Sequence, residues 1–327
     1  MLVVPKDLLP ADQRRWHEFL RDYFCDKDAI PTTEGNRVRL RLEWPGGVER
    51  HVDPELQTGL DWWGEGVTLS SMWSALRRDG RILTALYDTW TLLSWSEWLA
   101  GTAVARAENV ILLHVDDHRD LGAPRLITRD GALVDAITGA SVNLRDPDSI
   151  RKAIHSGAIG MGSFMTPFIH TVPDARVRHL CQPPKVRQTR NSNLVRKSVP
   201  DTLLHTGAER PAIDYAPVNA GASGSYLATS DAALWASGIE GRPTLVHIDM
   251  DYFNNRYDGD SEWRESTDRL DPNMSDIIEK IDKLVDALAR SRAEIEDVVI
   301  AYSPGFFPAE YWREADHRLR AGLEKIL

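Results

Sequence analysis

This chain has few cysteines, no excess of basic residues and no long apolar run, and each of these absences excludes a class of protein. Its 327 residues include two cysteines, Cys25 and Cys181, which lie far apart and form no CxxC motif. Such a count gives no support for a disulfide scaffold or a zinc ribbon, and it is typical of a reducing compartment. We therefore expect a cytoplasmic protein.

The charge balance and the hydropathy pattern narrow the range of partners. Asp and Glu number 49 against 39 Lys and Arg, so the formal net charge is -10, whereas non-specific nucleic-acid binding requires a basic surface. No apolar run is long enough to cross a membrane, and the first residues lack the basic and long apolar regions of a signal peptide. We expect neither nucleic acid nor membrane as a partner, and the oligomeric state is left open.

Two short acidic clusters follow apolar runs. Asp116, His118 and Asp120 belong to VILLHVDDHRD, and Asp249 and Asp251 belong to TLVHIDMDYF. Side chains at positions i, i+2 and i+4 of a strand share one face, so the members of each cluster are predicted to converge. Solvated strand ends are the alternative interpretation, but two such clusters after two buried strands favour a functional site.

The residue types in these clusters predict a divalent metal centre. Four carboxylates around one imidazole repel one another unless a cation lies between them. Oxygen ligands with one or two nitrogens suit Mn²⁺ ahead of Mg²⁺. Five ligands from two strands exceed what one catalytic ion usually needs, so we predict two ions.

From about residue 68 onward, strand and helix patterns alternate. Near-continuous apolar strands in such an alternation indicate a mostly parallel sheet with helices on both faces. Ligands of these sheets bind beyond the carboxyl ends of the strands, where both acidic clusters and residues 303–307 are expected. The predicted strands are 81–87, 109–117, 243–251 and 297–307, and the predicted helices are 94–107, 146–157, 230–238, 271–291 and 308–327.

We predict one α/β domain over residues 1–327, with two additions. Residues 1–66 form an N-terminal extension, in which 11–24 has the pattern of an amphipathic helix. The alternating NRVRLRLEW, followed by Pro45-Gly46-Gly47 and VERHV, predicts a β-hairpin. Residues 181–217 are basic and show little periodicity, so we predict a long surface loop, or alternatively a lid or docking surface for an acidic substrate.

The motifs Asp-x-His-x-Asp and Asp-x-Asp, each after an apolar strand, resemble the metal-binding motifs of the arginase, agmatinase and deacetylase superfamily. This resemblance implies a three-layer α/β/α arginase-like fold. In the ureohydrolase branch, Asp116 and Asp249 would bridge two manganese ions, Asp120 would complete one shell, and His118 and Asp251 would complete the other. The deacetylase branch holds one zinc ion and lacks the last carboxylate of each motif, so the sequence favours the binuclear branch.

One element of the ureohydrolase pattern is missing. These enzymes usually supply a second histidine ligand from a loop before the first motif, and here no histidine lies between His51 and His114. Asp88, in ALYDTWTLLSW, could replace it, or one ion could be weakly held or absent. His114 and His247 each precede a motif aspartate by two residues, and we interpret them as supporting or core groups and not as ligands.

Three further segments, IGMGSFMTPFIH, HIDMDYF and AYSPGFFPAEYW, look similar to those of peptide arginases. These enzymes convert arginine side chains of ribosomally made peptides to ornithine and release urea. The resemblance therefore implies a peptide substrate. Basic residues from Lys185 to Lys197 predict that the remote portion of this peptide is acidic.

Candidates for the catalytic roles come from the same regions. Asp120 or His155 could relay a proton to the leaving amine. Glu310 is the candidate for binding the guanidinium group, ahead of Asp117. The alternatives are that Glu310 is an acid favoured at a helix N-terminus and that His155 is structural.

Three functions remain open at this stage. The favoured one is a manganese-dependent hydrolase of guanidino groups, most specifically a peptide arginase. The second is a zinc-dependent deacetylase or amidohydrolase of the same fold. The third is a non-catalytic member that binds a metal and a peptide, for which the missing histidine is the best argument.

Overall fold

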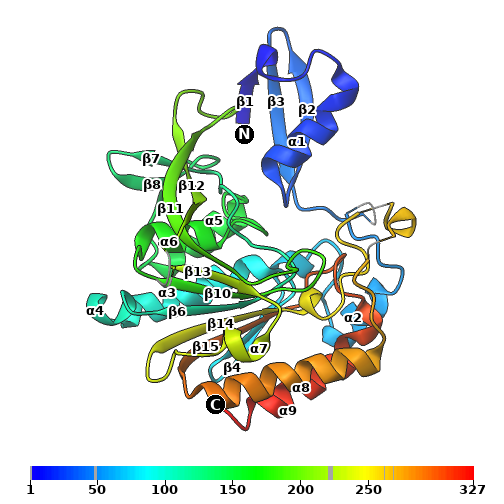
Figure 1. The fold of residues 1–327 in the computed structure, drawn as a ribbon. Helices are drawn as coiled ribbons and strands as arrows, with labels where there is room; N and C mark the ends of the chain where they lie inside the picture. Colours follow the sequence, from blue (N-terminus) through cyan, green and yellow to red (C-terminus); the bar gives the residue numbers. More distant parts are fainter. Residues whose placement is uncertain (1, 48–49, 220–223, 261, 268) are drawn as a thin grey trace.

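The computed structural model describes residues 2–47, 50–219, 224–260, 262–267 and 269–327. Within these residues, the largest element is a mixed sheet of nine strands in the order β12-β11-β13-β10-β6-β14-β15-β5-β4 (Figure 1). The predicted α/β class is therefore confirmed. No helix in the same residues has both the length and the apolar character that a membrane span requires.

The centre of this sheet is parallel, as the alternation of elements predicts. All neighbouring pairs from β13 to β5 run in the same direction. Every residue of β6 and β14 is buried, because helices cover both faces of such a sheet and leave no polar side. The parallel strands, in spatial order, are β13 (Tyr226–Thr229), β10 (Arg176–Leu180), β6 (Ile111–Val115), β14 (Pro243–Asp249), β15 (Glu294–Ala301) and β5 (Ile82–Ala85).

The two edges of the sheet are antiparallel. β4 (Leu76–Asp79) pairs with β5 at one edge. At the other edge, β11 (Arg190–Pro200) pairs with β13 and with the outermost strand, β12 (Glu209–Pro217). We refer to β11, β12 and the connecting residues 201–208 as the hairpin.

Helices lie on both faces of the sheet. α8 (Met274–Ser291) and α9 (Trp312–Leu323) pack together on one face, and α3 (Thr91–Gly101), α5 (Pro147–Ser156) and α6 (Met165–Thr171) lie on the other (Figure 1). Three further helices of the described chain between residues 50 and 327 are α2 (Leu56–Trp63), α4 (Val104–Ala107) and α7 (Ala232–Trp235).

Local sequence signals account for the helix boundaries. The Asp146 carboxylate accepts a hydrogen bond from the Asp148 backbone N–H, and Pro147 occupies the first turn of α5, both favoured at a helix start. In α8, buried Ile277, Ile281, Leu284 and Leu288 recur at helical spacing, so the helix has one apolar face.

Residues 2–44 form a separate small unit, which we call the N-terminal unit. Its strands β1 (Leu2–Pro5), β2 (Asp28–Glu34) and β3 (Arg37–Glu43) form an antiparallel sheet in the order β1-β3-β2, and α1 (Trp16–Phe24) covers one face. Its buried residues form their own cluster, which also contains Leu203 of the hairpin. In Figure 1 the unit stands beside the hairpin, above the main sheet.

The prediction of a β-hairpin at Pro45-Gly46-Gly47 is wrong. β3 is a strand as predicted, but its partners are β1 and β2, and residues 50–52 form no strand; Val48 and Glu49 lie outside the described residues. A two-residue turn, Gly35–Asn36, joins β2 to β3, and Gly35 has a φ of 64°. Glycine adopts this conformation without steric cost, so the chain reverses direction between β2 and β3 at this turn.

The prediction of a loop over residues 181–217 is also wrong for residues 190–217. β11 and β12 pair over nine positions, from Ser192 with Pro217 to Pro200 with Glu209. Most β11 side chains are exposed or half-buried, so its sequence carries no alternating apolar pattern to identify it. At the connecting residues, the Tyr23 hydroxyl of the N-terminal unit donates to Asp201 at 2.8 Å.

Smaller elements complete the fold. A second three-stranded sheet contains β7 (Leu126–Arg129), β8 (Ala132–Asp135) and β9 (Ser141–Val142). The 3-10 helices are η1 (Lys6–Leu8), η2 (Gln13–Arg15), η3 (Met72–Ser74), η4 (Asp88–Trp90), η5 (Met250–Tyr252), η6 (Trp263–Glu265) and η7 (Ala309–Tyr311).

Candidate metal centre

Four adjacent parallel strands bring acidic and polar residues to one edge of the sheet. Asp116 directly follows β6, and Asp249 ends β14. Asp88 and Ser303 come shortly after β5 and β15. These strands lie in the order β6-β14-β15-β5, so their carboxyl ends meet, as in the ligand sites of open parallel sheets.

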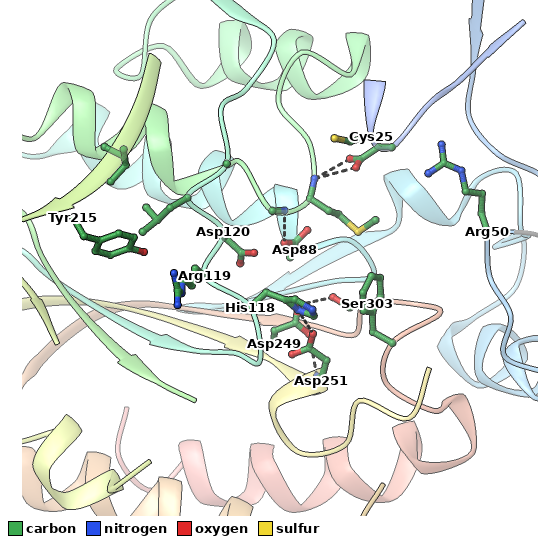
Figure 2. Close-up of a pocket in the computed structure, with 17 residues that line it drawn as sticks. Cys25, Arg50, Asp88, His118, Arg119, Asp120, Tyr215, Asp249, Asp251 and Ser303 are labelled. Carbon is green, nitrogen blue, oxygen red and sulfur yellow. Dashed lines mark hydrogen bonds and ion pairs between the residues drawn. The ribbon is translucent and has the colours of Figure 1, made fainter. Parts of the chain in front are cut away.

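A cavity of about 570 Å³ lies at these strand ends (Figure 2). We call it the first cavity. Cys25 and Asp26 of the N-terminal unit, together with Arg50, line it on one side, and Ile213 and Tyr215 of β12 line it on another. Its lining from the loops at the strand ends includes Arg119 and the polar residues Asp88, His118, Asp120, Asp249, Asp251 and Ser303.

The loop after β6, and not the pleat of a strand, brings the first motif together. β6 ends at Val115, so the expectation that strand periodicity aligns the motif is wrong. Instead, the His118 backbone N–H donates to the Asp116 carboxylate, and Asp120 has a φ of 51°. The second motif turns in the same way, because the Asp251 backbone N–H donates to Asp249 Oδ1 at 3.1 Å.

One set of possible metal ligands consists of Asp116, His118 and Asp251. Their ligand atoms lie within 4.8 Å of one another. His118 Nδ1 lies 2.8 Å from Asp251 Oδ2 and 3.5 Å from Asp116 Oδ1. Ligands about 2.0–2.2 Å from an ion lie roughly 3–4.4 Å from one another, so small side-chain movements suffice to hold an ion here.

A second set consists of Asp116, Asp120, His114 and His247, all buried. His114 Nε2 lies 3.7 Å from Asp116 Oδ2 and 3.8 Å from Asp120 Oδ2, and His247 Nδ1 lies 3.9 Å from Asp116 Oδ2. Asp116 thus belongs to both sets. The sequence predicts the two histidines to be supporting groups, but their ring nitrogens lie close enough to Asp116 and Asp120 for one ion to contact all four residues.

The two histidines belong to a row across three neighbouring strands. His179 of β10 is in register with His114 of β6, which is in register with His247 of β14. Burial lowers the pKa of His114 well below its usual value, that of His179 to about 4 and that of His247 to about 3. The neutral imidazole is the form that binds metals.

Hydrogen bonds fix this row beneath the cavity. His114 Nδ1 and His247 Nδ1 lie 3.0 Å apart, and His114 Nε2 lies 3.1 Å from the His118 carbonyl oxygen. His179 contacts the Asp116 carbonyl oxygen through Nε2, at 2.9 Å, and the Tyr226 hydroxyl through Nδ1, at 2.8 Å. His179 is therefore fully engaged, whereas His114 would exchange its contact with the His118 carbonyl for an ion.

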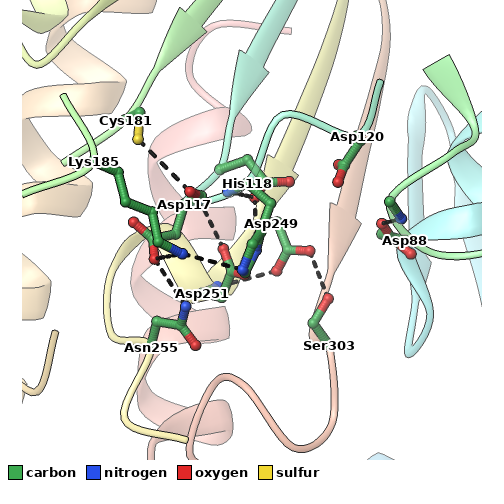
Figure 3. A network of polar contacts seen from close by, with 12 residues as sticks. Asp88, Asp117, His118, Asp120, Cys181, Lys185, Asp249, Asp251, Asn255 and Ser303 are labelled. Atoms are coloured by element: carbon green, nitrogen blue, oxygen red, sulfur yellow. Dashed lines mark hydrogen bonds and ion pairs between the residues drawn. The ribbon is translucent and has the colours of Figure 1, made fainter. Parts of the chain in front are cut away.

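Asp249 and Asp88 line the first cavity but belong to none of the ligand sets found among the described residues. The Ser303 hydroxyl donates to Asp249 Oδ2 at 2.5 Å (Figure 3). Within the described part of the chain, Asp88 accepts only long hydrogen bonds, from the Gly162 backbone N–H at 3.5 Å and the Thr89 hydroxyl at 3.4 Å. The bridging role of Asp249 therefore stays a prediction, and Asp88 keeps an open carboxylate.

The carboxylates of the cavity destabilise one another's charged forms. Burial, with a contribution from neighbouring carboxylates, raises the pKa of Asp88, Asp116 and Asp249 well above the usual value, and burial raises the pKa of Asp120 to about 6. Burial acts in the same direction on Asp251, but the adjacent His118 lowers its pKa overall. A cation in the cavity would relieve this repulsion.

One polar atom identifies where a cation fits. Asp120 Oδ2, which lies 3.8 Å from His114 Nε2, is buried without any hydrogen-bond partner in the described part of the chain, a situation that costs free energy unless a ligand or ion satisfies the atom. Asp120 belongs to the second ligand set. The buried His and Asp groups can thus hold a metal ion.

A third set, Asp117, His118 and Asp258, is more exposed than the other two sets. A lysine side chain, Lys185, already lies against it (Figure 3). The Lys185 ammonium lies 2.7 Å from Asp117 and 3.4 Å from Asp258. This ammonium lies against both carboxylates and offsets part of their charge, so we do not count the set as a metal site.

The structure does not bring Glu310 or His155 into the first cavity. Glu310 is exposed and forms an ion pair with Arg256 at 3.0 Å. His155 is an exposed residue of α5 whose ring packs edge-on against Trp73 and Trp90. The structure therefore gives both residues contacts outside the first cavity, and neither is placed to act on a ligand bound there.

Comparison with protein-family models gives no match for this chain, and comparison with curated proteins gives none either.

Proposed function

We propose that the protein is an arginase-like, manganese-dependent hydrolase of guanidino groups. More specifically, we propose a peptide arginase that converts arginine side chains of a ribosomally made peptide to ornithine and releases urea. The observation that carries this proposal is the pair of ligand sets that share Asp116 at a buried, carboxylate-lined cavity.

Two divalent ions account for the donors better than one. Asp116, His118 and Asp251 would hold one ion, and Asp116, Asp120 and His114, with His247 beside them, would hold the other. Carboxylates with a minority of imidazoles suit Mn²⁺. When bound, the ions would supply a water nucleophile at neutral pH and would offset negative charge that develops during hydrolysis.

The remaining carboxylates of the cavity suit a guanidinium substrate. A guanidinium group is planar, permanently charged and able to donate two parallel hydrogen bonds to one carboxylate. Asp88 is buried and lies close to Asp120 in the lining of the first cavity (Figures 2 and 3), and it accepts only long hydrogen bonds from the described residues. We therefore assign to Asp88 the binding of the guanidinium, in place of Glu310.

The test combines metal analysis with product detection. The purified protein, loaded with Mn²⁺, is incubated with arginine-containing peptides and with free arginine, and urea and ornithine are measured. We expect about two ions per chain and urea release from peptides. Asp116→Asn should lose both metal and activity, whereas Asp214→Asn, which changes an exposed carboxylate paired with Lys197, should lose neither.

Two outcomes would replace the proposal. One zinc ion per chain with release of acetate from acetyl-lysine peptides would support the deacetylase. Tight binding of metal and peptide, without any product, would support the non-catalytic alternative.

A further inference from the structure

A second cavity adjoins the first. It has a volume of about 610 Å³, and it shares His118, Arg119 and Tyr215 with the first cavity. Figure 2 shows these three residues on the side of the first cavity away from Cys25 and Arg50. A ligand that reaches the carboxylates of the first cavity therefore borders directly on the second.

The two cavities differ in their balance of charge. In the first, carboxylates outnumber the two arginines that line it, Arg50 and Arg119. In the second, the acidic residue is Asp117, which Lys185 neutralises at 2.7 Å. Arg119 and Arg190 also line the second cavity, and in the described part of the chain neither forms an ion pair. The second cavity therefore has uncompensated positive charge.

Aromatic rings hold one of these charges in place. Tyr215 and Tyr226 pack edge-on at 5.1 Å, and the Arg119 guanidinium lies over the Tyr215 ring at 5.5 Å. Arg119 and Arg190 are exposed, so an incoming anion can reach both, and salt screens the attraction. Arg190 belongs to β11 and Tyr215 to β12, so the hairpin contributes to this surface.

We propose that the second cavity binds an acidic side chain close to the target arginine in the substrate peptide. This subsite rests on the proposed function, because it requires an arginine side chain in the first cavity. Consecutive Cα atoms lie about 3.8 Å apart, so adjoining cavities receive side chains that are one or two positions apart. The enzyme would thus select arginine residues next to Asp or Glu.

The other basic residues of the segment do not contribute. Lys197 is paired with Asp214 at 2.7 Å, and Arg196 donates to the His170 carbonyl oxygen. Lys185 is paired with Asp117, and Arg187 lines neither cavity. The positive charge that meets the substrate is therefore restricted to Arg119 and Arg190, which is narrower than the basic segment from Lys185 to Lys197.

The first experiment measures binding and needs no catalysis. Labelled peptides with both ends capped carry one arginine, flanked at one and two positions by either Glu or Gln, and their binding to the full chain without added metal is followed by fluorescence anisotropy. We expect the Glu peptide to bind about tenfold more tightly, and the ratio to fall as salt screens the charges. Arg190→Gln should bring the ratio close to one.

Lys197→Gln provides the matched control, because it removes the same charge from the same strand outside both cavities. It should keep the preference for Glu. The same peptides are then compared by urea release from the manganese-loaded enzyme, where the preference should lie mainly in KM.

The possible failures are distinguishable. Equal binding and equal kcat/KM for the Glu and Gln peptides, with urea released from both, would refute the subsite and leave the proposed function intact. A preference for Glu in binding that Arg190→Gln removes, without urea from either peptide, would support the subsite and refute the proposed function. A preference that survives in Arg190→Gln but is lost in Lys197→Gln would place the acid-binding surface outside the second cavity and so overturn the subsite.

Discussion

Asp120 and Ser303 both line the first cavity and both have a positive φ, 51° and 42°. Residues other than glycine in this left-handed region cost on the order of 1–3 kcal/mol each, and they concentrate at functional sites. The strained conformation of Ser303 places its hydroxyl on Asp249, and that of Asp120 leaves one carboxylate oxygen without a hydrogen-bond partner among the described residues. At both positions, an unfavourable backbone conformation accompanies the orientation of a carboxylate in the first cavity.

The histidine row provides a direct test of the ligand sets. His114→Gln should remove about one ion per chain, because it takes a nitrogen ligand from the set that contains Asp120. His179→Gln is the control, since His179 occupies the same row and belongs to no set. Elemental analysis of both folded variants decides the matter, and equal metal content would show that His114 is a supporting group.

Asp88→Asn separates guanidinium binding from metal binding. The substitution keeps the shape of the side chain and removes its charge, so we expect unchanged metal content and a KM for arginine peptides raised about tenfold or more. Inductively coupled plasma analysis and steady-state kinetics measure the two quantities. Loss of one ion in this variant would instead make Asp88 the replacement for the missing histidine ligand.

The sequence predicts these residues to different degrees. The motif spacing identifies Asp116, His118, Asp120 and Asp251, all of which occur in the ligand sets. His114 escapes prediction as a ligand, because a histidine within an apolar strand has the same pattern whether it packs or binds. Register between strands, which sequence spacing does not specify, brings it toward its neighbours.

At the scale of elements, the hairpin is the part of the fold that the hydrophobic pattern of the sequence does not predict. No residue of β11 is buried, so polar residues occupy successive positions and its sequence has the pattern of a loop, although β11 pairs with β12 and β13. The buried strands β6, β14 and β15 are predicted from their apolar runs, and α8 from its spacing. Elements with a buried apolar face can thus be predicted from the sequence, whereas strands that are held mainly by backbone hydrogen bonds cannot.

The connection after α1 gives a prediction about pH. Asp26 is buried, its carboxylate accepts a hydrogen bond from the Met161 backbone N–H at 3.0 Å, and burial raises its pKa to about 6. Because its pKa in the unfolded chain is lower, ionisation of Asp26 reduces the free energy of unfolding as the pH rises from about 4 to about 6. Asp26→Asn should therefore gain stability relative to the natural chain over this range, by about 2–3 kcal/mol.

Urea unfolding of both proteins at several pH values, without added metal, measures this difference. The Asn side chain can still accept the hydrogen bond from Met161, so the comparison isolates the charge. A difference that does not change with pH would show that Asp26 ionises normally in the folded protein.

At the scale of the whole molecule, the alternation of strands and helices predicts the α/β class and the parallel centre of the sheet. It does not predict the antiparallel edges or the pairing within the N-terminal unit, because these depend on which strands meet. The position of the cavity follows from the strand order. The acidic and polar residues after the four strands form one site because these strands are neighbours in the sheet.

The crowded carboxylates make global stability depend on metal. Without metal, Asp116→Asn should be at least as stable as the natural chain, because it removes one buried negative charge from the cluster. With Mn²⁺ at about a hundredfold excess over its Kd, the natural chain should gain on the order of 2.7 kcal/mol per site, and the variant should gain less. Thermal melts with EDTA and with Mn²⁺ measure both effects, and equal gains would contradict a role for Asp116 in metal binding.

The shared core of the N-terminal unit and the hairpin has a consequence for how the chain is made. Leu203 packs with Val4, Leu20, Phe24 and Val38, yet it leaves the ribosome long after them. At roughly 5–20 residues per second, the delay is on the order of ten seconds or more. During that time the unit exposes apolar surface, so nascent chains that end before the hairpin should be far more susceptible to proteases than chains that include it.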